Sequence, residues 1–148
     1  MRVGDILKVK SNSTIYSIAP DGAVADAVAL MVERDVGSLV VLRDGEMVGL
    51  ITFREVLAAL HRQGGNLGAA RVEQVMVRDP TCGDPQDSVD QMRTVMIEQH
   101  IRYLPIREGS RLVGVLSFHD VARAALKAAS LENRALKQYI KNWPESEQ

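Results

Sequence analysis

The chain has 148 residues, 18 basic and 19 acidic side chains, and a formal net charge of −1. Acids and bases are interspersed, so the composition offers no field that would attract nucleic acid or an anionic membrane. No apolar run reaches the roughly 20 residues of a membrane span, and charges interrupt the N-terminal residues MRVGDILKVK, so we expect no signal peptide. A single cysteine, Cys82, excludes an internal disulfide and indicates a cytoplasmic protein.

The first half of the chain predicts a mixed succession of short strands and helices. Apolar residues at one-face spacing predict a helix from Val24, and Asp44-Gly45 is a strong hairpin signal. The elements expected in order are a short amphipathic segment, a strand, a helix, two strands of a hairpin and a second helix: Val3–Lys8, Thr14–Ile18, from Val24, Ser38–Leu42, Glu46–Ile51 and from Phe53.

The second half repeats this pattern at an offset of 65 residues. Ten residues between 20 and 59 meet an identical residue 65 positions later, and they are Pro20, Val24, Met31, Glu33, Leu39, Val48, Gly49, Phe53, Val56 and Ala59. The duplication predicts a helix, a strand, a helix and two strands in the second half, at Arg71–Met76, Thr81–Cys82, from Val89, Tyr103–Arg107 and Arg111–Leu116. A last helix from Phe118 should run toward Asn142, before Pro144.

A unit of about 60 residues buries too little surface to be comfortably stable alone. We therefore expect two repeats that pack together, with residues 1–66 and 67–130 as the repeats and 131–148 as a C-terminal helical extension and tail. The extension carries apolar side chains beyond the needs of a terminal helix, which favours a contact between subunits.

Each repeat has a strand that ends in a hydroxyl residue, with an acid three positions later. Ser117 and Asp120 form one such corner, and Thr52 and Glu55 form the other. This spacing suits a capping box at a helix start, and it also suits a helix N-terminus that holds a phosphate and a ribose. For Thr52 and Glu55 the capping box is the preferred interpretation.

The chain resembles tandem cystathionine-β-synthase (CBS) domain pairs. The matching stretches are VGSLVV and VGLITFRE in the first repeat, and IRYLPI and VGVLSFHD in the second, at 36–41, 48–55, 101–106 and 113–120. The resemblance spans about Val3 to Leu126, so it implies a stand-alone pair with a mixed α/β (α+β) fold. Two βαββα-type repeats would pack as a pseudo-twofold disc, and a homodimer of two discs is expected.

The resemblance also implies a function and a set of ligand contacts. Many family members bind adenine nucleotides between the repeats and act as energy or redox sensors in signal transduction. The expected ligand is AMP or ATP, with NAD(H) or S-adenosylmethionine as alternatives, and no metal is required. Asp120 would hold the ribose more effectively than Glu55, because Glu replaces the family's Asp there. The candidate nucleotide-binding residues are Lys10, Ser13, Tyr16, Val36, Gly37, Ser38, Thr52, Arg54, Glu55, Arg102, Tyr103, Ser117, His119 and Asp120.

Catalysis is not expected, because the chain has no Gly-rich phosphate loop, nucleophile elbow or paired metal-binding histidines. The alternative to a sensor is an oligomerisation or protein-interaction module without a nucleotide. Nucleic-acid binding through Lys8, Lys10, Arg54 and Arg102 is a weaker idea that the balanced charge disfavours. Beyond the nucleotide, a partner protein would read the signal.

Overall fold

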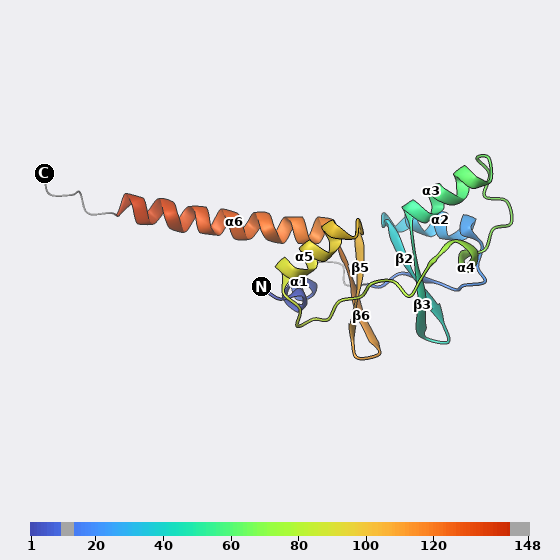
Figure 1. The fold of residues 1–148 in the computed structure, drawn as a ribbon, viewed down its shortest axis with the longest axis horizontal. Helices are drawn as coiled ribbons and strands as arrows, with labels where there is room; N and C mark the ends of the chain where they lie inside the picture. The colour runs from blue at the N-terminus through green and yellow to red at the C-terminus, as the bar shows by residue number, and fades with distance from the viewer. Residues whose placement is uncertain (10–13, 143–148) are drawn as a thin grey trace, which may run out of the picture.

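The fold is a mixed α and β architecture of two similar units side by side, with one long helix projecting from the second (Figure 1). It is described from a computed structural model in which residues 1–9 and 14–142 are placed. The elements in chain order are α1 (Val3–Val9), β1 (Ser17–Ile18), α2 (Val24–Arg34), β2 (Ser38–Arg43), β3 (Glu46–Thr52), α3 (Phe53–Arg62), α4 (Val72–Val75), β4 (Val77–Arg78), α5 (Val89–Glu98), β5 (Tyr103–Glu108), β6 (Arg111–Ser117) and α6 (Phe118–Lys141). The predicted α+β class is confirmed.

Both predicted hairpins form, each at a turn that needs a left-handed residue. β2 and β3 pair antiparallel across Asp44-Gly45, where φ is 52° and 80°. Positive φ at both central residues gives the turn whose twist matches that of the flanking strands. β5 and β6 pair antiparallel on either side of the turn that contains Gly109, whose φ is 64°.

The two sheets differ at their edges. In the first, β1 pairs parallel with β2, and β4 pairs antiparallel with β3. The strand expected at Thr81–Cys82 is reduced to one parallel bridge between Gly83 and Ile106, so that prediction is wrong as a strand. Pro80 and Pro85 flank the segment and lack the N–H group that a longer ladder needs. The strand β4 was not predicted, and its two residues are too few to show a pattern.

Each hydrophobic core contains a short helical segment from the other half of the sequence. Val3 and Ile6 of α1 are buried in the core of the second repeat, together with Val89, Leu104 and Val121. Figure 1 shows α1 beside β6 and α4 in the other unit, near β3.

The first repeat receives the matching contribution from the second half of the sequence. Ala70, Val72 and Met76 are buried there among Val24, Leu39 and five further buried members of that core. Full burial of a valine such as Val72 contributes about 1.5–3 kcal/mol. The cores therefore cross the sequence division at residue 66.

Backbone hydrogen bonds fix both exchanged segments in the same way. Val72 N–H donates to Gly22 O at 2.8 Å, and Val24 N–H donates to Ala70 O at 2.9 Å. At the matching place, Val3 N–H donates to Asp87 O at 2.9 Å, and Val89 N–H donates to Met1 O at 3.1 Å.

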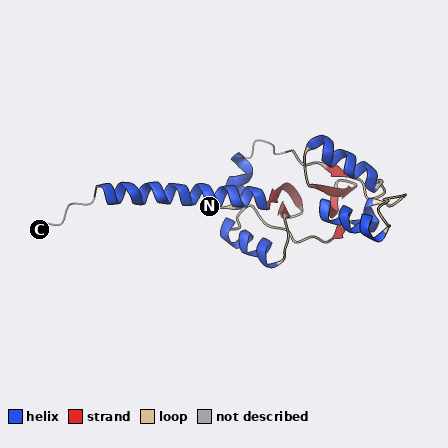
Figure 2. Cartoon of the chain, turned by 90° about the horizontal axis from the view of Figure 1, so that it is seen from above, coloured by secondary structure: helices blue, strands red, loops and turns tan. Residues whose placement is uncertain are grey.

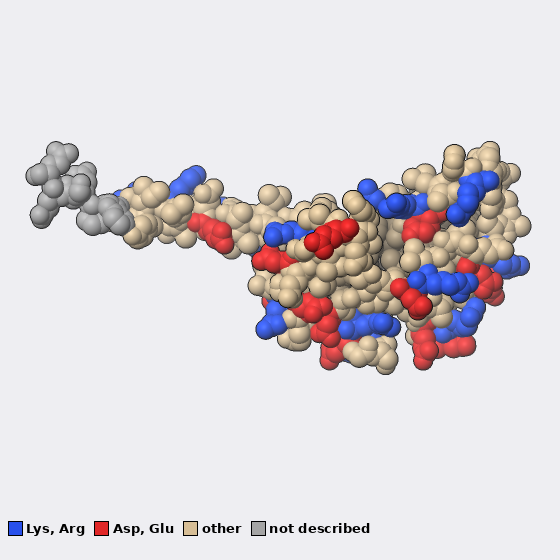
Figure 3. Space-filling model, viewed as in Figure 1, with Lys and Arg blue, Asp and Glu red and all other residues tan. Residues whose placement is uncertain are grey.

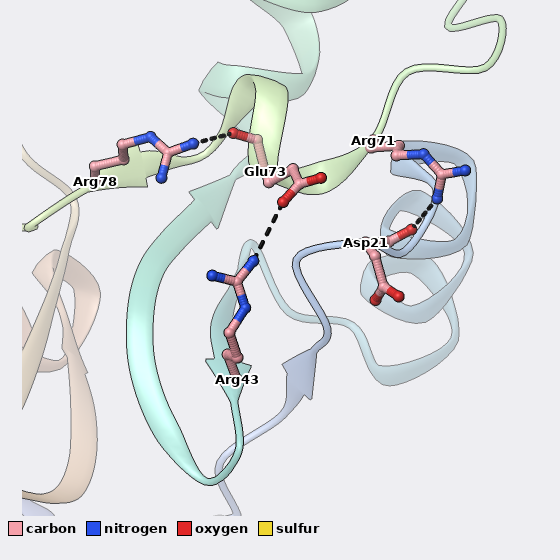
Figure 4. Close-up of polar contacts among 5 residues, drawn as sticks. All are labelled: Asp21, Arg43, Arg71, Glu73 and Arg78. Atoms are coloured by element: carbon pink, nitrogen blue, oxygen red, sulfur yellow. Dashed lines mark hydrogen bonds and ion pairs between the residues drawn. The ribbon is translucent and has the colours of Figure 1, made fainter.

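Polar side chains add to the attachment of α4 (Figure 4). Arg43 forms an ion pair with Glu73 at 3.3 Å, and the Arg71 guanidinium donates to Asp21 O at 2.6 Å. Arg78 donates to Glu73 O at 3.2 Å. The second half of the chain is thus bonded directly to the first repeat.

The Val-Gly pair of each repeat leaves room for these crossings. A Cβ atom on Gly49 would lie 2.6 Å from Met76 Sδ and 2.8 Å from Val77 O, which belong to the exchanged segment. A Cβ on Gly114 would lie 3.0 Å from a methyl group of Leu7 in α1. The backbone φ is not positive at either glycine. Glycine is therefore required by the close approach of these neighbours and not by a left-handed backbone conformation.

Helix α6 ends at Lys141 with Asn142 as its C-cap, which confirms the predicted extent. Its first part packs against α5, β6 and α1, and Val121 is fully buried. Its remainder leaves the body of the molecule, as Figure 2 shows from above.

Candidate functional site

Two clefts of about 350 Å³ each lie between the repeats. We name them after the acid that lines each one. The Asp120 cleft is lined by Leu7, Thr14, Ile15, Tyr16, Asp35, Val36, Gly37, Ser38, Val40, Tyr103, Val113, Gly114, Val115, Ser117, His119 and Asp120. The Glu55 cleft is lined by Leu50, Thr52, Phe53, Arg54, Glu55, Val77, Asp79, Pro80, Thr81, Gln99, His100, Ile101, Arg102 and Tyr103.

In the Asp120 cleft, the hydroxyl–acid corner forms a reciprocal capping box. Asp120 N–H donates to Ser117 Oγ at 3.0 Å, and Ser117 N–H donates to Asp120 Oδ2 at 3.0 Å. The box holds the carboxylate at the start of α6, where the helix dipole favours negative charge. Asp120 is half-buried and lines the cleft, so the capping position is also a position from which a ligand can be contacted.

In the Glu55 cleft, the corner is built differently. Thr52 Oγ1 accepts from Arg54 N–H at 3.2 Å, and the Thr52 hydroxyl donates to Glu55 Oε2. The reciprocal box expected for this pair is therefore wrong, although Thr52 does cap α3. The Glu55 carboxylate is thus bonded to the Thr52 hydroxyl, whereas the Asp120 carboxylate is bonded to the backbone N–H of Ser117.

The predicted contacts separate into two groups. Tyr16, the segment 36–38, Ser117, His119 and Asp120 all line the Asp120 cleft. Thr52, Arg54, Glu55 and Arg102 line the Glu55 cleft. Lys10 and Ser13 lie outside the described residues, and Lys8 is exposed on α1.

Tyr103 lines both clefts and forms the wall between them. A Cβ atom on Gly37 would lie 2.0 Å from its hydroxyl oxygen, so glycine at 37 makes room for the phenol. Its ring also packs edge-on against Phe53, with 6.3 Å between centroids. Burial raises the pKa of Tyr103; the Arg102 guanidinium lowers it and the Asp120 carboxylate raises it.

Arg102 stacks on the wall of the Glu55 cleft. Its guanidinium carbon lies 5.5 Å from the centre of the Phe53 ring, a cation–π geometry. The sequence interpretation gave it as a nucleotide-binding candidate, and the structure places it in the cleft of Arg54 and Glu55.

The profile of the CBS domain family matches residues 3–62 and 72–127. The chain belongs to the CBS domain family. It carries two CBS repeats in tandem, which confirms the resemblance seen in the sequence.

Relatives cover most of this CBS pair. It is 30% identical over 146 residues to the CBS domain-containing protein CBSX3, mitochondrial, of Arabidopsis thaliana, covering 93% of this chain and 71% of that protein. A structure of a protein with CBS domains from Burkholderia ambifaria is 31% identical, with a TM-score of 0.81 over 86% of this chain and 95% of that one. CBSX2 in complex with AMP is 26% identical, with a TM-score of 0.70 and coverage of 86% and 98%.

Several lining residues were missed although the duplication could have found them. Tyr16 and Val36 map by the offset of 65 onto Thr81 and Ile101, which line the other cleft. Asp35 and His100 are likewise equivalent. Each comes just after a helix and has a left-handed backbone conformation, with φ of 53° and 55°. Applying the offset to Tyr16 and Val36 would have added Thr81 and Ile101 to the predicted lining residues.

Within residues 1–9 and 14–142, no group of three or more His, Cys, Asp or Glu side chains is placed to hold a metal ion. In the same residues, no helix combines the length and the hydropathy that crossing a bilayer requires.

Burial raises the pKa of the Cys82 thiol, with Arg107 acting in the opposite direction. Acidic and basic side chains are interspersed on the face seen in Figure 3.

Proposed function

We propose that this CBS pair is a non-catalytic regulatory module that binds an adenosine-containing nucleotide in the Asp120 cleft. The observation that carries the proposal is the position of Asp120, a carboxylate fixed by its capping box at a helix start and facing a cleft of about 350 Å³. A carboxylate in this place accepts hydrogen bonds from two ribose hydroxyls. The AMP complex of CBSX2, at 26% identity, supports an adenine nucleotide as the ligand class.

The remaining walls suit the nucleoside. Tyr16 and Val36 belong to the first repeat, whereas Asp120 belongs to the second. They offer an aromatic ring and an apolar side chain to the cleft, and Gly37 and Ser38 offer backbone and hydroxyl groups. Such a mixture of apolar surface and a few polar groups is typical of small-molecule sites. The base would lie against the first repeat and the ribose against the second, so that binding would couple the two.

The charges of the described residues favour different ligands in the two clefts. His119 is the one His, Lys or Arg among the described residues that line the Asp120 cleft, which also contains Asp35. The Glu55 cleft contains Arg54, Arg102 and His100. A monophosphate or the cationic S-adenosylmethionine therefore suits the Asp120 cleft better than ATP, whose phosphates suit the Glu55 cleft.

The test is a thermal-shift and calorimetric panel with AMP, ADP, ATP, NAD, NADH and S-adenosylmethionine. A ligand at 100 times its Kd stabilises the folded state by about 2.7 kcal/mol. Asp120→Asn keeps an oxygen that accepts from Ser117 N–H but removes the charge, and a charge-assisted hydrogen bond contributes about 1.5–3 kcal/mol. The variant should therefore bind the nucleotide about 10- to 100-fold more weakly.

Glu55→Gln is the matched control, because it removes one carboxylate from the equivalent position of the other cleft. It should leave binding in the Asp120 cleft unchanged. Equal binding by the parent and by Asp120→Asn would remove the ribose role. The absence of any shift, with protein shown to carry no nucleotide, would favour the assembly module instead.

We further propose that the partner of this module is a protein that distinguishes the ligand-bound from the ligand-free pair, that the pair acts as a homodimer, and that it works in the cytoplasm. Ligand binding between the repeats would stabilise one arrangement of the two repeats over another. It would therefore change the surface that a partner protein contacts. The Arabidopsis relative is named as mitochondrial. Organelle fractionation is therefore the measurement that tests the cytoplasmic location of this protein.

A further inference from the structure

The ring of His119 lines the Asp120 cleft at the start of α6. His119 is the second residue of this helix and directly precedes Asp120. It lines the cleft together with Ser117 and Asp120, and its side chain is exposed to solvent. Which of its two ring nitrogens carries a proton therefore decides what the ring offers to a ligand in the cleft.

Arg123 contacts this ring from one turn further along the helix. Its Nη2 atom lies 3.4 Å from His119 Nδ1, and a separation of four residues places two side chains on the same face of a helix. A guanidinium group has five N–H donors and no acceptor. The direction of the hydrogen bond is therefore fixed, because Arg123 can only donate and His119 Nδ1 must accept through its lone pair.

An Nδ1 atom that accepts this hydrogen bond carries no proton. The ring is then neutral, and its one N–H group is at Nε2. The two nitrogens of an imidazole point in diverging directions, so the nitrogen that donates is directed away from Arg123. Because the ring lines the cleft, His119 offers a neutral N–H donor there and not a positive charge.

The other repeat differs at both positions of this pair. The offset of 65 maps His119 onto Arg54, which brings a full cation into the Glu55 cleft. It maps Arg123 onto Ala58, whose side chain has no group that could contact Arg54 in the same way. The contact between a cation and a cleft-lining ring thus belongs to the Asp120 cleft.

We propose that Arg123 is a positioning residue that holds His119 as the tautomer with its proton at Nε2, so that the ring donates to the phosphate of a nucleoside monophosphate in the Asp120 cleft. The inference rests on the proposed function for its ligand, whereas the contact between the two side chains does not depend on it. An N–H donor suits the phosphate, whose oxygens are acceptors, and a hydrogen bond to an anion is of the stronger, charge-assisted kind. Asp120 already supplies the acceptor for the ribose hydroxyls.

The competing interpretation is that Arg123 contacts the phosphate directly. Of these two described side chains, His119 lines the Asp120 cleft and Arg123 does not. Arg123 therefore acts from behind the ring, as the partner that fixes its tautomer. An effect of Arg123 on binding that requires His119 distinguishes the two interpretations.

The tautomer is measured in the full chain by long-range ¹H–¹⁵N NMR of the histidine rings at pH 8, where an ordinary imidazole is neutral. Of the three histidines, His119 is assigned from the signals that are missing in His119→Gln. The parent should carry the proton at Nε2, and Arg123→Met should show a mixture of the two tautomers. A proton at Nδ1 in the parent, or the same spectrum in the parent and in Arg123→Met, would overturn the proposal. This measurement needs no nucleotide.

The effect on binding is measured by calorimetry with AMP and with adenosine, which lacks the phosphate. Arg123→Met should weaken the binding of AMP about 2- to 10-fold, the loss expected for one hydrogen bond, and should leave the binding of adenosine unchanged. In a His119→Ala background, Arg123→Met should have no further effect on AMP. An equal effect in both backgrounds would show that Arg123 contacts the ligand directly, and an equal loss with adenosine would exclude the phosphate; either result overturns the proposal.

The matched control is Lys127→Met, which removes one positive charge from the same helix one turn beyond Arg123. It should match the parent in the tautomer of His119 and in AMP binding. Arg123→Lys keeps a donor in the same place and should retain much of both. If the parent binds neither AMP nor adenosine, the proposed function fails and the phosphate role of His119 is overturned with it, while the tautomer spectrum decides the role of Arg123 independently.

Discussion

Tyr103 is the residue through which the two clefts of the pair are connected. Its hydroxyl lies against Gly37 of the first repeat, and its ring packs on Phe53 at the start of α3. The duplication places Ser38 at the equivalent position, so only one of the two repeats contributes a large side chain to this wall. A ligand that moves the phenol in one cleft therefore changes the shape of the other.

The raised pKa of Tyr103 predicts a dependence of stability on alkaline pH. Folding favours the neutral phenol, so its contribution is complete below the ordinary pKa of 10.0 and is lost as pH rises through the higher pKa of the folded state. Urea unfolding from pH 8 to 11 should show a steeper loss of the free energy of unfolding in the parent than in Tyr103→Phe. Parallel curves for the two proteins would contradict this.

The acids at the helix starts show how far single residues can be read from sequence. Both hydroxyl–acid corners were visible, and a capping box was compatible with each of them. The reciprocal box forms at Ser117 and Asp120, whereas Thr52 caps α3 without one. The spacing in the sequence is the same at both corners, and Gln74, which is as long as Glu, accepts the corresponding bond from the N-cap N–H of Arg71 at α4, so neither spacing nor side-chain length distinguishes the two corners. Residue type and position were predictable, whereas which oxygen meets which N–H was not.

At the scale of elements, the exchanged helices explain why each repeat has a Val-Gly pair in its last strand. The strands β3 and β6 must let α4 and α1 pass closely over their backbones. The contact is tighter at Gly49, where the neighbour includes the backbone oxygen of Val77, than at Gly114, where it is the end of the Leu7 side chain.

Gly49→Ala should therefore destabilise the protein by about 1–3 kcal/mol, the usual cost of forcing atoms into a packed site. Gly114→Ala is the control and should cost less, because a leucine side chain can rotate away and a backbone oxygen cannot. Urea denaturation with parallel circular dichroism measures both. Equal midpoints for the parent and Gly49→Ala would contradict the tight crossing.

The sequence predicted most elements because their signals are local. Hairpin glycines and helix periodicity act within short windows, and the offset of 65 shows that the same local signals occur again in the second half. The exchange of α1 and α4 was not predicted, since Val3–Val9 and Val72–Val75 read as short amphipathic helices whichever core they enter. Their partners are set by long-range packing. The same reason hid the placement of Arg102 in the Glu55 cleft.

At the scale of the whole molecule, the exchange predicts that the two halves stay together when the chain between them is cut. A protease site inserted between Gly64 and Gly65 lies in the exposed segment after α3. The cleaved fragments should still co-elute in size-exclusion chromatography and should separate only in urea, because each core needs residues from the other fragment. Fragments that separate in native buffer would show that the shared cores are too weak to hold them.

The exchanged helices also suggest how a protein of this kind could have arisen before its duplication. A single ancestral repeat, with its own short helix extended away from its core, could complete that core only by accepting the helix of another copy, as in a domain-swapped dimer. Joining two such genes end to end would convert that encounter between molecules into one within a chain, where the effective concentration is far higher. In this history the helices keep the partners they had as separate proteins. Tandem duplication then allowed the two clefts to diverge, and the acid at one helix start could remain Asp while the other became Glu.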